Sequence, residues 1–536
     1  MLGPRIGFVG RTPWSAADAP VGLRAITYDI SDGRPEAARG PAADQGSAPQ
    51  SQLILGQSTR WSSVARVSWL LLLSSSTYFI FLAAVFFLYW PLSRVRSLAL
   101  GVLLFANYFF YAKWDMWYLA LIPVASSCDY FFGLGLQSAK NAIVRRILVG
   151  ASLLMNLGML AFFKYMPFFL ENYTKATGKS APEWHWTLPI TLSFYVFQAL
   201  TYTIDLYRRD AKGTTSYLAH LTAVSFFPTT LAGPITRVST LIDQFEKPRK
   251  LDPIDGGRAL FLIGMGLTKK LLIADYLSAN LVNRVFDFPA LYSGSEVLIA
   301  VYAFALQIYF DFSGYTDIAI GSALLLGIKL PPNFNAPYAA VNIADFWRRW
   351  HITLSNWLRD YLYFSLPGLR SKWKIFTYWN LFITMVIGGL WHGASWTFVV
   401  WGAIHGLGLA VHRFWQVSRG NKKVTGFWKY FNIFVTIQFV CFAWIFFRSA
   451  NWENAYAILS RIGSLSFSVA NISAPLALIM GIAILAHYCP KRWYDFSLSV
   501  YSRAPFYVQA LALALLVVGL QYVAQTGATP FMYNKF

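Results

Sequence analysis

From Trp69 onward the chain is a close succession of apolar runs, and this pattern limits its fold more than any other feature. Candidate runs of roughly 17–25 residues match the thickness of a bilayer and are typical of membrane-spanning helices. Hydrophobic residues make up 56% of the 536 residues and charged residues 13%, against about a quarter charged in soluble domains. The sequence therefore predicts an all-α polytopic membrane protein.

Thirteen apolar segments are candidate spans, and because some are short or interrupted we expect about eleven full transmembrane helices. Their centres lie near residues 80, 105, 120, 153, 195, 265, 303, 320, 383, 403, 438, 480 and 514. Leu188-Pro189, Phe227-Pro228 and Gly233-Pro234 break apolar stretches. Non-helical backbone at membrane depth needs cover from protein or water, so these breaks predict re-entrant or half-spanning helices around an internal cavity.

The first 65 residues differ in composition from the rest. The first fifty hold seven Gly, six Pro and nine Ala and no apolar stretch long enough for a signal-peptide core. We expect residues 1–65 to form a flexible extension, or to reflect a start codon placed too far upstream, and residues 66–536 to form one membrane domain.

The formal net charge is +21, with the cations gathered in short connections between apolar runs. In a soluble protein this excess would indicate nucleic-acid binding. Here it is typical of cytoplasmic loops and of contact with anionic membrane lipids, and no nucleic-acid partner is expected. A sharper interpretation is that some clusters attract an anionic cytosolic donor such as a coenzyme A thioester.

Residues 333–363 form the most unusual segment. Asn342 or Asp345 is a candidate cap for the helix that follows, and within that helix Asp345 is spaced to pair with Arg348 or Arg349. His351 and Ser355 share one helix face at i, i+4 spacing. An interfacial amphipathic helix explains the Trp and Arg residues but not the histidine, so structural and functional interpretations both stay open.

A second histidine, His392, lies in a long apolar helix next to Trp391 and between glycines at 388, 389 and 393. Small residues allow another backbone, or a substrate, to approach closely. The alternative is a helix-packing groove with a structural imidazole. Two intramembrane histidines together favour chemistry, because imidazole is suited to take a proton from an alcohol. His405 and His412 are expected to have packing or interfacial roles.

Asp311 and Asp317 are two carboxylates in one apolar run, where charge is costly and usually marks a pathway or a partner. We expect them to pair with Arg348, Arg349 or a histidine. Their spacing of six does not place both on one helix face, so they are not predicted to be an acid–base dyad.

Several other chemistries lack their motifs. The sequence has no Gly-x-Ser-x-Gly elbow, no Walker-type glycine loop, and no His-Glu-x-x-His or compact His/Cys/Asp cluster. We therefore expect no catalytic metal. What remains is direct transfer assisted by a histidine base.

Three blocks resemble the signature blocks of membrane-bound O-acyltransferases: FDFSGYTD at 310–317, DFWRRWHITLS at 345–355 and GLWHGASW at 389–396. They look most like the bacterial branch that contains alginate O-acetylation membrane proteins and, more distantly, the D-alanyl transferases of teichoic acids. FFPTTLAGPITR at 226–237 is similar to a further block of that branch. The resemblance covers about residues 70 to 525, in the expected order, although the block at 226–237 matches only loosely.

The resemblance implies a ring of tilted helices around a central funnel, with His351 and His392 at its centre. It implies an O-acyltransferase of the bacterial inner membrane that uses acetyl-CoA or an acyl-loaded carrier protein and has no bound cofactor. It also implies a periplasmic acetyltransferase partner in a pathway that exports an acylated polysaccharide such as alginate. A transporter of glycan or lipid that does no chemistry is the alternative from another class.

At the site we predict His392 as general base. His351 then orients the donor or stabilises the oxyanion, with Arg348 and Arg349 as electrostatic support. Asp311, Asp317, Ser355 and Trp391 are further candidates for supporting the site or binding substrate. The two histidines are able to exchange roles, because sequence spacing fixes no distance between them.

Overall fold

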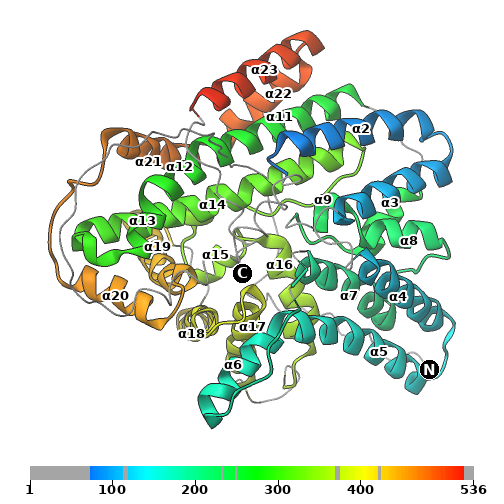
Figure 1. The fold of residues 1–536 in the computed structure, drawn as a ribbon, viewed down its shortest axis with the longest axis horizontal. Helices are drawn as coiled ribbons and strands as arrows, with labels where there is room; N and C mark the ends of the chain where they lie inside the picture. The colour runs from blue at the N-terminus through cyan, green and yellow to red at the C-terminus, as the bar shows by residue number, and fades with distance from the viewer. Residues whose placement is uncertain are drawn as a thin grey trace, which may run out of the picture.

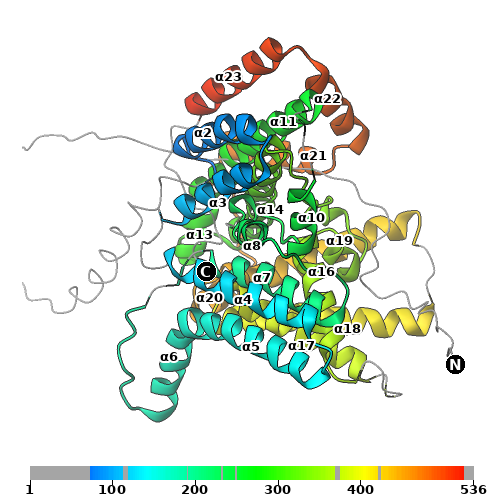
Figure 2. The ribbon, with the colours of Figure 1, turned by 90° about the vertical axis from the view of Figure 1, so that its right-hand side faces the viewer.

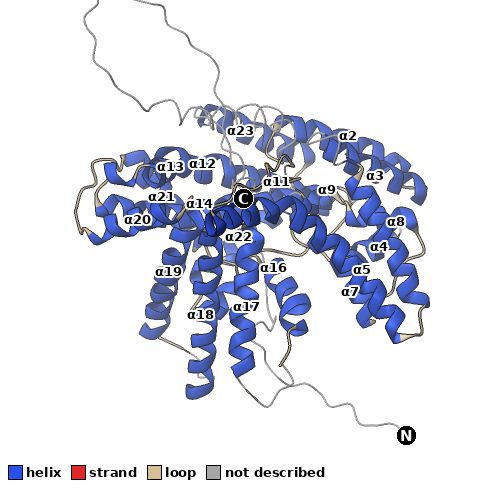
Figure 3. Ribbon diagram, turned by 60° about the horizontal axis from the view of Figure 1, so that its bottom comes forward, coloured by secondary structure: helices blue, strands red, loops and turns tan. Residues whose placement is uncertain are grey.

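The computed structural model describes residues 73–523 except 113–118, 187, 190, 231–232, 248–249, 251, 369–372, 374 and 421–423. Every regular element within these residues is a helix, which confirms the all-helical prediction (Figures 1 and 3). The expected extension, residues 1–65, lies outside the described part of the chain.

The first half of the described chain contains long helices and several short ones. They are α2 (Ser76–Leu92), α3 (Arg96–Ala112), α4 (Leu121–Ser138), α5 (Ala142–Leu160), η3 (Ala161–Tyr165), α6 (Met166–Thr177), α7 (Leu192–Arg208), α8 (Tyr217–Val224), α9 (Phe227–Thr230), α10 (Val238–Phe245), α11 (Pro253–Lys269), η4 (Lys270–Ala274), α12 (Asp275–Leu277), η5 (Ser278–Val282) and α13 (Asn283–Asp287).

The second half has the same mixture. Its elements are η6 (Pro289–Leu291), α14 (Gly294–Leu325), η7 (Pro337–Ala339), α15 (Ile343–Trp347), α16 (Ile352–Trp357), η8 (Leu358–Leu362), η9 (Tyr363–Ser365), α17 (Ile375–His392), α18 (Trp396–Arg419), α19 (Phe427–Arg448), α20 (Trp452–Gly463), α21 (Ala474–His487), α22 (Lys491–Arg503) and α23 (Phe506–Val523).

Helix α14 crosses the centre of the molecule (Figure 1). Its start is fixed by a capping box in which Ser293 accepts from the backbone of Glu296 and Glu296 accepts from the backbone of Ser293. The predicted spans near 303 and 320 are both parts of this one 32-residue helix, so counting them separately was wrong. Helix α14 is buried along most of its length, so its sequence stays mainly apolar and has no polar loop of the kind that separates two spans.

Three described helical segments are long and apolar enough to cross a membrane: Ala142–Thr177, α14 and α19. The pair α21 and α22, bent by 89°, adds a fourth if it is one broken span. The segments Ser76–Leu92, Arg96–Ala112 and Phe506–Leu520 are apolar but shorter.

Exposure follows the pattern of a lipid-embedded chain. Large apolar side chains such as Phe87, Phe105 and Leu154 are more than 70% exposed, whereas Asp129 and Asn156 are fully buried. Apolar surface outside and polar groups inside is the arrangement that a bilayer favours.

Short helices fill the middle of the structure. In Figure 1, α15 and α16 lie near the centre, with α14, α7, α17 and α18 around them. The four residues of α9 are buried at the predicted break around Pro228, which confirms the expectation of interrupted helices covered by protein. Helices α17 and α18 pack along each other (Figure 3), and the α6 end of the α5–η3–α6 helix projects away from the bundle (Figure 2).

Candidate functional site

His351 lies at a break between two short helices. Its backbone is left-handed, with φ of 41°, and it precedes α16. The prediction of a single helix after Asn342 is therefore wrong, because α15 ends at Trp347 and α16 begins at Ile352. The chain turns here because the segment around Asn333 binds the turn, with the amide of Ile352 donating to the Asn333 carbonyl at 2.8 Å. Left-handed backbone costs energy in a non-glycine residue and is enriched at functional sites.

This segment is not an interfacial helix. Trp347 and Trp350 are about 1% exposed and His351 is fully buried, so the aromatic residues form core rather than a headgroup belt. Two finer expectations are confirmed. The Asn342 side chain caps α15 by accepting from the Asp345 amide at 2.8 Å, and Asp345 pairs with both Arg348 and Arg349.

The side chain of Asn333 sets the protonation of the His351 ring. Asn333 Oδ1 accepts from the Thr353 amide at 3.1 Å and from Thr353 Oγ1 at 2.9 Å, and it lies 3.0 Å from His351 Nδ1. A backbone amide only donates, so the Asn333 atom in this position is its carbonyl oxygen. His351 Nδ1 must then carry the proton, and Nε2 carries the lone pair.

That Nε2 atom is buried and has no hydrogen-bond partner in the described residues. Unsatisfied buried polar atoms are rare in proteins, so such an atom calls for an explanation. A nitrogen with a lone pair and no partner is able to accept a proton from a substrate hydroxyl.

His392 is the last residue of α17 and is also buried. Its ring centroid lies 5.0 Å from those of Trp391 and Trp401 and 5.3 Å from that of Phe447. His392 lies within electrostatic range of His351, Lys164 and His405. The fold thus brings together the two histidines that the sequence analysis singled out.

The glycines beside His392 accommodate a neighbouring helix. A Cβ at Gly389 would overlap the carbonyl oxygen of Phe398, and a Cβ at Gly393 would overlap the Phe398 ring. A Cβ at Gly402 on α18 would in turn overlap the carbonyl of Met385. Of the two expected uses of these glycines, close approach of another backbone is what the structure displays.

Arg348 and Arg349 lie at the rim of the buried site. Their side chains are 36% and 30% exposed, and they bind Asp345 at 3.2 and 3.0 Å. Their charges act on His412 and His487 respectively.

Asp311 and Asp317 have partners other than the expected ones. Asp317 binds Lys269 at 2.6 Å and Asp311 binds Lys270 at 3.1 Å, with all four side chains buried. The sequence analysis named Arg348, Arg349 or a histidine as partners, whereas α11 and η4 pack along α14 and bring Lys269 and Lys270 to these carboxylates. The signal was present as Lys269-Lys270 within an apolar run.

Ser355 and Trp391 are both buried. The Ser355 amide donates to the His351 carbonyl at 3.0 Å, and its hydroxyl donates to the Trp350 carbonyl at 3.3 Å. Trp391 stacks on Phe197, with the ring centroids 4.9 Å apart and the planes 19° apart. Both residues shape the surroundings of the histidines.

A pocket of about 520 Å³ reaches the residues that hold His351. Thr353 lines it, and so do the cations Arg237, Lys329 and Arg359. A second pocket, of about 200 Å³, is lined by Asn333. Asn333 and Thr353 hydrogen-bond to each other, so both pockets approach His351 through the same pair of residues.

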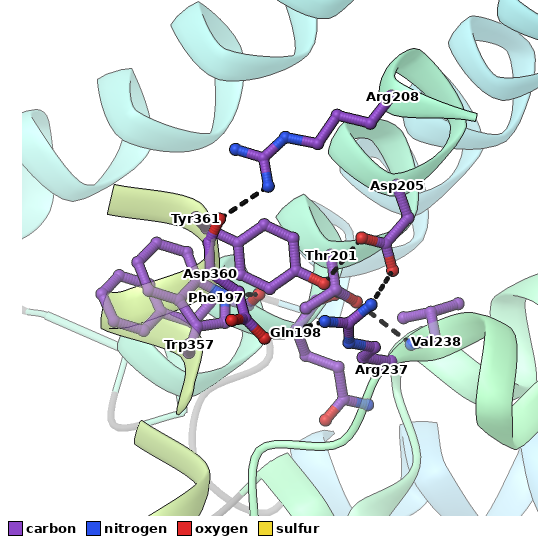
Figure 4. Close-up of polar contacts among 10 residues, drawn as sticks. All are labelled: Phe197, Gln198, Thr201, Asp205, Arg208, Arg237, Val238, Trp357, Asp360 and Tyr361. Carbon is purple, nitrogen blue, oxygen red and sulfur yellow. Dashed lines mark hydrogen bonds and ion pairs between the residues drawn. The ribbon is translucent and has the colours of Figure 1, made fainter. Parts of the chain in front are cut away.

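One wall of the larger pocket is a network of ion pairs (Figure 4). Arg237 binds Asp360 at 2.8 Å and Asp205 at 3.5 Å, and its guanidinium lies 5.4 Å from the Tyr361 ring centroid. Tyr361 donates to Asp205 at 2.8 Å, and Arg208 donates to the Asp360 carbonyl at 2.6 Å. These contacts tie α7 to η8, so the pocket has a rigid charged wall.

Sequence reasoning did not identify Lys164. This buried lysine lies in η3 and donates to the backbone carbonyls of Trp391 at 2.6 Å and His392 at 3.2 Å. A lone lysine in the apolar run around residue 160 was the available signal, by the same rule that drew attention to Asp311 and Asp317.

The chain is similar in sequence to a known protein family and to several of its members. The family model described as the membrane-bound O-acyltransferase family matches residues 147–453, which include both histidines. A peptidoglycan O-acetyltransferase of Helicobacter pylori is 36% identical over 390 residues, covering 68% of this chain and 73% of the relative. A probable alginate O-acetylase AlgI of Pseudomonas putida is 34% identical over 497 residues, covering 86% and 99%.

A more distant relative is a teichoic acid D-alanyltransferase of Bacillus subtilis, 30% identical over 245 residues, which cover 42% of this chain and 59% of the relative. The similarity to the two O-acetylation proteins is therefore both higher and longer.

Proposed function

The chain belongs to the membrane-bound O-acyltransferase family, and we propose that it moves acetyl groups from a cytosolic thioester across the inner membrane for O-acetylation of an exported polysaccharide. The protein is a membrane-embedded O-acyltransferase. The names of its relatives support acetyl as the group transferred and a cell-envelope polymer as its destination. The observation that carries the proposal is the buried Nε2 of His351, which has no hydrogen-bond partner among the described residues and lies within electrostatic range of His392.

In the proposed reaction, the acceptor hydroxyl attacks the carbonyl carbon of the acetyl thioester. A new C–O bond forms, the C–S bond breaks, and the hydroxyl proton passes through a histidine to the departing thiolate. The products are the acetyl ester and the free thiol. Because the site is buried in apolar side chains, removing the proton as the hydroxyl attacks avoids a costly cation on oxygen, an effect of about 10²–10⁴ in rate.

The geometry at Asn333 supports the exchanged assignment of the two histidines, with His351 as base. Its Nε2 holds a lone pair, so in this tautomer it accepts a proton and cannot donate a hydrogen bond to an oxyanion. His392 then contacts the thioester from the other side. The assignment deduced from the sequence, with His392 as base, is the alternative, and near-normal activity in His351→Ala would favour it.

We place the donor at the larger pocket. Arg237, Lys329 and Arg359 line it and suit the phosphates of acetyl-CoA, while Thr353 connects it to Asn333 and His351. Cations at this end of the helices, including Arg208 and Arg209, are consistent with a cytoplasmic opening. An acyl carrier protein is the alternative donor.

The remaining parts of the proposal concern topology and partners. About eleven spans around a central funnel, an inner-membrane location and contact with anionic lipids fit the apolar outer surface and interrupted central helices. A periplasmic acetyltransferase is the expected recipient of the acetyl group. A D-alanine-activating ligase and carrier encoded beside this gene would instead favour D-alanyl transfer.

The test uses purified protein in proteoliposomes with acetyl-CoA labelled in the acetyl group and a polysaccharide that supplies the acceptor hydroxyl. We expect release of free thiol and loss of labelled thioester that both disappear in the His351→Ala variant. D-alanyl-loaded carrier is offered in parallel. Transport of a glycan or lipid with no thioester consumed from either donor would overturn the enzymatic proposal.

A further inference from the structure

The end of α17, where His392 lies, is held by one neighbouring segment. Lys164 Nζ donates to the carbonyls of Trp391 and His392, and the Tyr165 hydroxyl donates to the carbonyl of Leu390 at 3.1 Å. The preceding carbonyl, that of Gly389, accepts from the Gly393 amide. Two adjacent side chains of η3 therefore bind the three carbonyls with which α17 ends.

These carbonyls need donors from outside their own helix. The last carbonyls of an α-helix have no intrahelical partner and carry the negative end of the helix dipole. In a membrane-embedded site, leaving them unpaired is costly, and a cation at this position is favourable. Lys164 supplies donors to two of these carbonyls.

Lys164 itself has an unusual environment. It is buried, and in the described residues it forms no ion pair with a carboxylate, its remaining hydrogen bond being a 3.5 Å contact with Ser193 Oγ. A buried cation without an acidic partner is expensive, so its position is explained best by what it holds. Lys164 Nζ also lies 5.9 Å from the Trp391 ring centroid, so the side chain contacts the end of α17 through this ring as well.

The same segment also holds the start of α18. Asn172 on α6 accepts from the Trp396 indole at 2.9 Å, and Phe168 packs on the Trp396 ring with centroids 5.6 Å apart. The helical segment from Lys164 to Asn172 therefore contacts both the end of α17 and the start of α18. Lys164 lies in a π-helical turn, a distortion that is frequent at functional sites.

We infer that Lys164, assisted by Tyr165, is a positioning residue that fixes the last turn of α17 and so the place of His392 in the reaction. This inference rests on the proposed acyl transfer. The hydrogen bonds of Lys164 hold the backbone that carries the imidazole. A shift of that turn moves His392 relative to the donor without changing the donor pocket.

The test compares Lys164→Met, which keeps the apolar stem, with Lys164→Arg, which keeps the donors and charge. We expect Lys164→Met to lower kcat by about tenfold to a hundredfold while KM for acetyl-CoA changes by less than about twofold, because misplacement of a reacting group acts on the chemical step. Lys164→Arg should recover part of the loss. Lys175→Met, which removes an exposed lysine of the same helical segment that pairs with Glu171 at 2.6 Å, is the matched control and should keep the wild-type kcat.

Hydrogen–deuterium exchange gives a readout that does not depend on activity. We expect faster exchange at residues 390–396 in Lys164→Met and in Tyr165→Phe, and unchanged exchange in α14. If Lys164→Met does not accumulate in the membrane, the Tyr165→Phe variant tests the inference instead, because it removes one of the three hydrogen bonds.

Wild-type kcat and exchange in a folded Lys164→Met protein, or in Tyr165→Phe where that variant decides, would overturn the inference. That result leaves the proposed function intact, because the wild-type enzyme would still consume thioester. If the wild-type protein transfers no acyl group from any donor, the proposed function fails, and the exchange data still decide whether Lys164 holds the turn.

Discussion

Asn333 Oδ1 accepts hydrogen bonds from three groups, and one of them is the Nδ1–H of His351 at 3.0 Å. The other two come from the amide and hydroxyl of Thr353, which fix the orientation of the Asn333 amide. Asn333 therefore determines both the tautomer of His351 and the direction of its ring.

Replacing Asn333 should impair catalysis more than binding. In Asn333→Ala the His351 ring loses the acceptor that keeps the proton on Nδ1, so we expect kcat to fall by about a hundredfold, within the range of general-base catalysis. Thr353→Val removes the hydroxyl bond to Asn333 and the bond from the Ile235 amide, but it leaves the Thr353 amide donating to Asn333, and a loss of only a few-fold is expected. Steady-state kinetics with acetyl-CoA measure both, and equal losses in the two variants would contradict the assignment.

The histidines themselves give a second prediction. At matched membrane expression, His351→Ala and His392→Ala should each reduce acyl transfer to below about one hundredth of wild type. His405→Ala should keep most of the activity, because His405 Nδ1 accepts from the Trp347 indole at 3.3 Å and serves packing. The His405→Ala variant should lose about 1–3 kcal/mol of unfolding free energy, because the Trp347 indole loses its acceptor. This loss should appear as a lower melting temperature. Near-normal activity in His351→Ala would exclude it as the base.

The buried pair Lys269–Asp317 should contribute strongly to folding. Asp317→Asn leaves the Lys269 ammonium buried without its partner, so we expect a loss of about 3–5 kcal/mol, measured by thermal unfolding in detergent. Asp345→Asn, at the more exposed pairs with Arg348 and Arg349, should cost about 1 kcal/mol or less. The double variant Lys269→Met/Asp317→Leu should recover much of the loss, and a single-variant cost equal to that of Asp345→Asn would contradict the argument.

Close packing of α17 on α18 predicts unequal effects of two neighbouring glycines. Gly389→Ala places its Cβ against the Phe398 carbonyl, a backbone atom that cannot turn aside, and should cost about 1–3 kcal/mol of stability. Gly388→Ala meets only the Leu358 side chain at 3.3 Å and should be tolerated better. Thermal unfolding distinguishes the two, and equal melting temperatures would argue against the packing explanation.

The sequence predicted the parts of this site that depend on residue type and motif. An intramembrane histidine is unusual on its own, and the blocks around His351 and His392 are long enough to identify. The helical class also followed directly from the length and spacing of the apolar runs.

What the sequence did not predict depends on contacts between distant segments. Asp317 had several cations available, and only the packing of α11 on α14 selects Lys269. The turn at His351 depends on hydrogen bonds to Asn333, which local helix propensity does not register. Lys164 was missed because its partners are backbone carbonyls of α17. Every residue has a backbone carbonyl, so no sequence motif identifies these partners.

The proposed donor pocket gives the last prediction. Arg359→Gln and Lys329→Gln remove positive charge from its lining, so KM for acetyl-CoA should rise by about fivefold to tenfold while kcat changes little, as expected when uniform binding is lost. The Lys329 side chain is 70% exposed, so raising the salt concentration should reduce the difference between Lys329→Gln and wild type. Arg96→Gln, which removes an exposed cation paired with Glu246 and outside the pocket lining, is the matched control. An unchanged KM in Arg359→Gln and Lys329→Gln, or an equal rise in Arg96→Gln, would mean that the donor enters elsewhere.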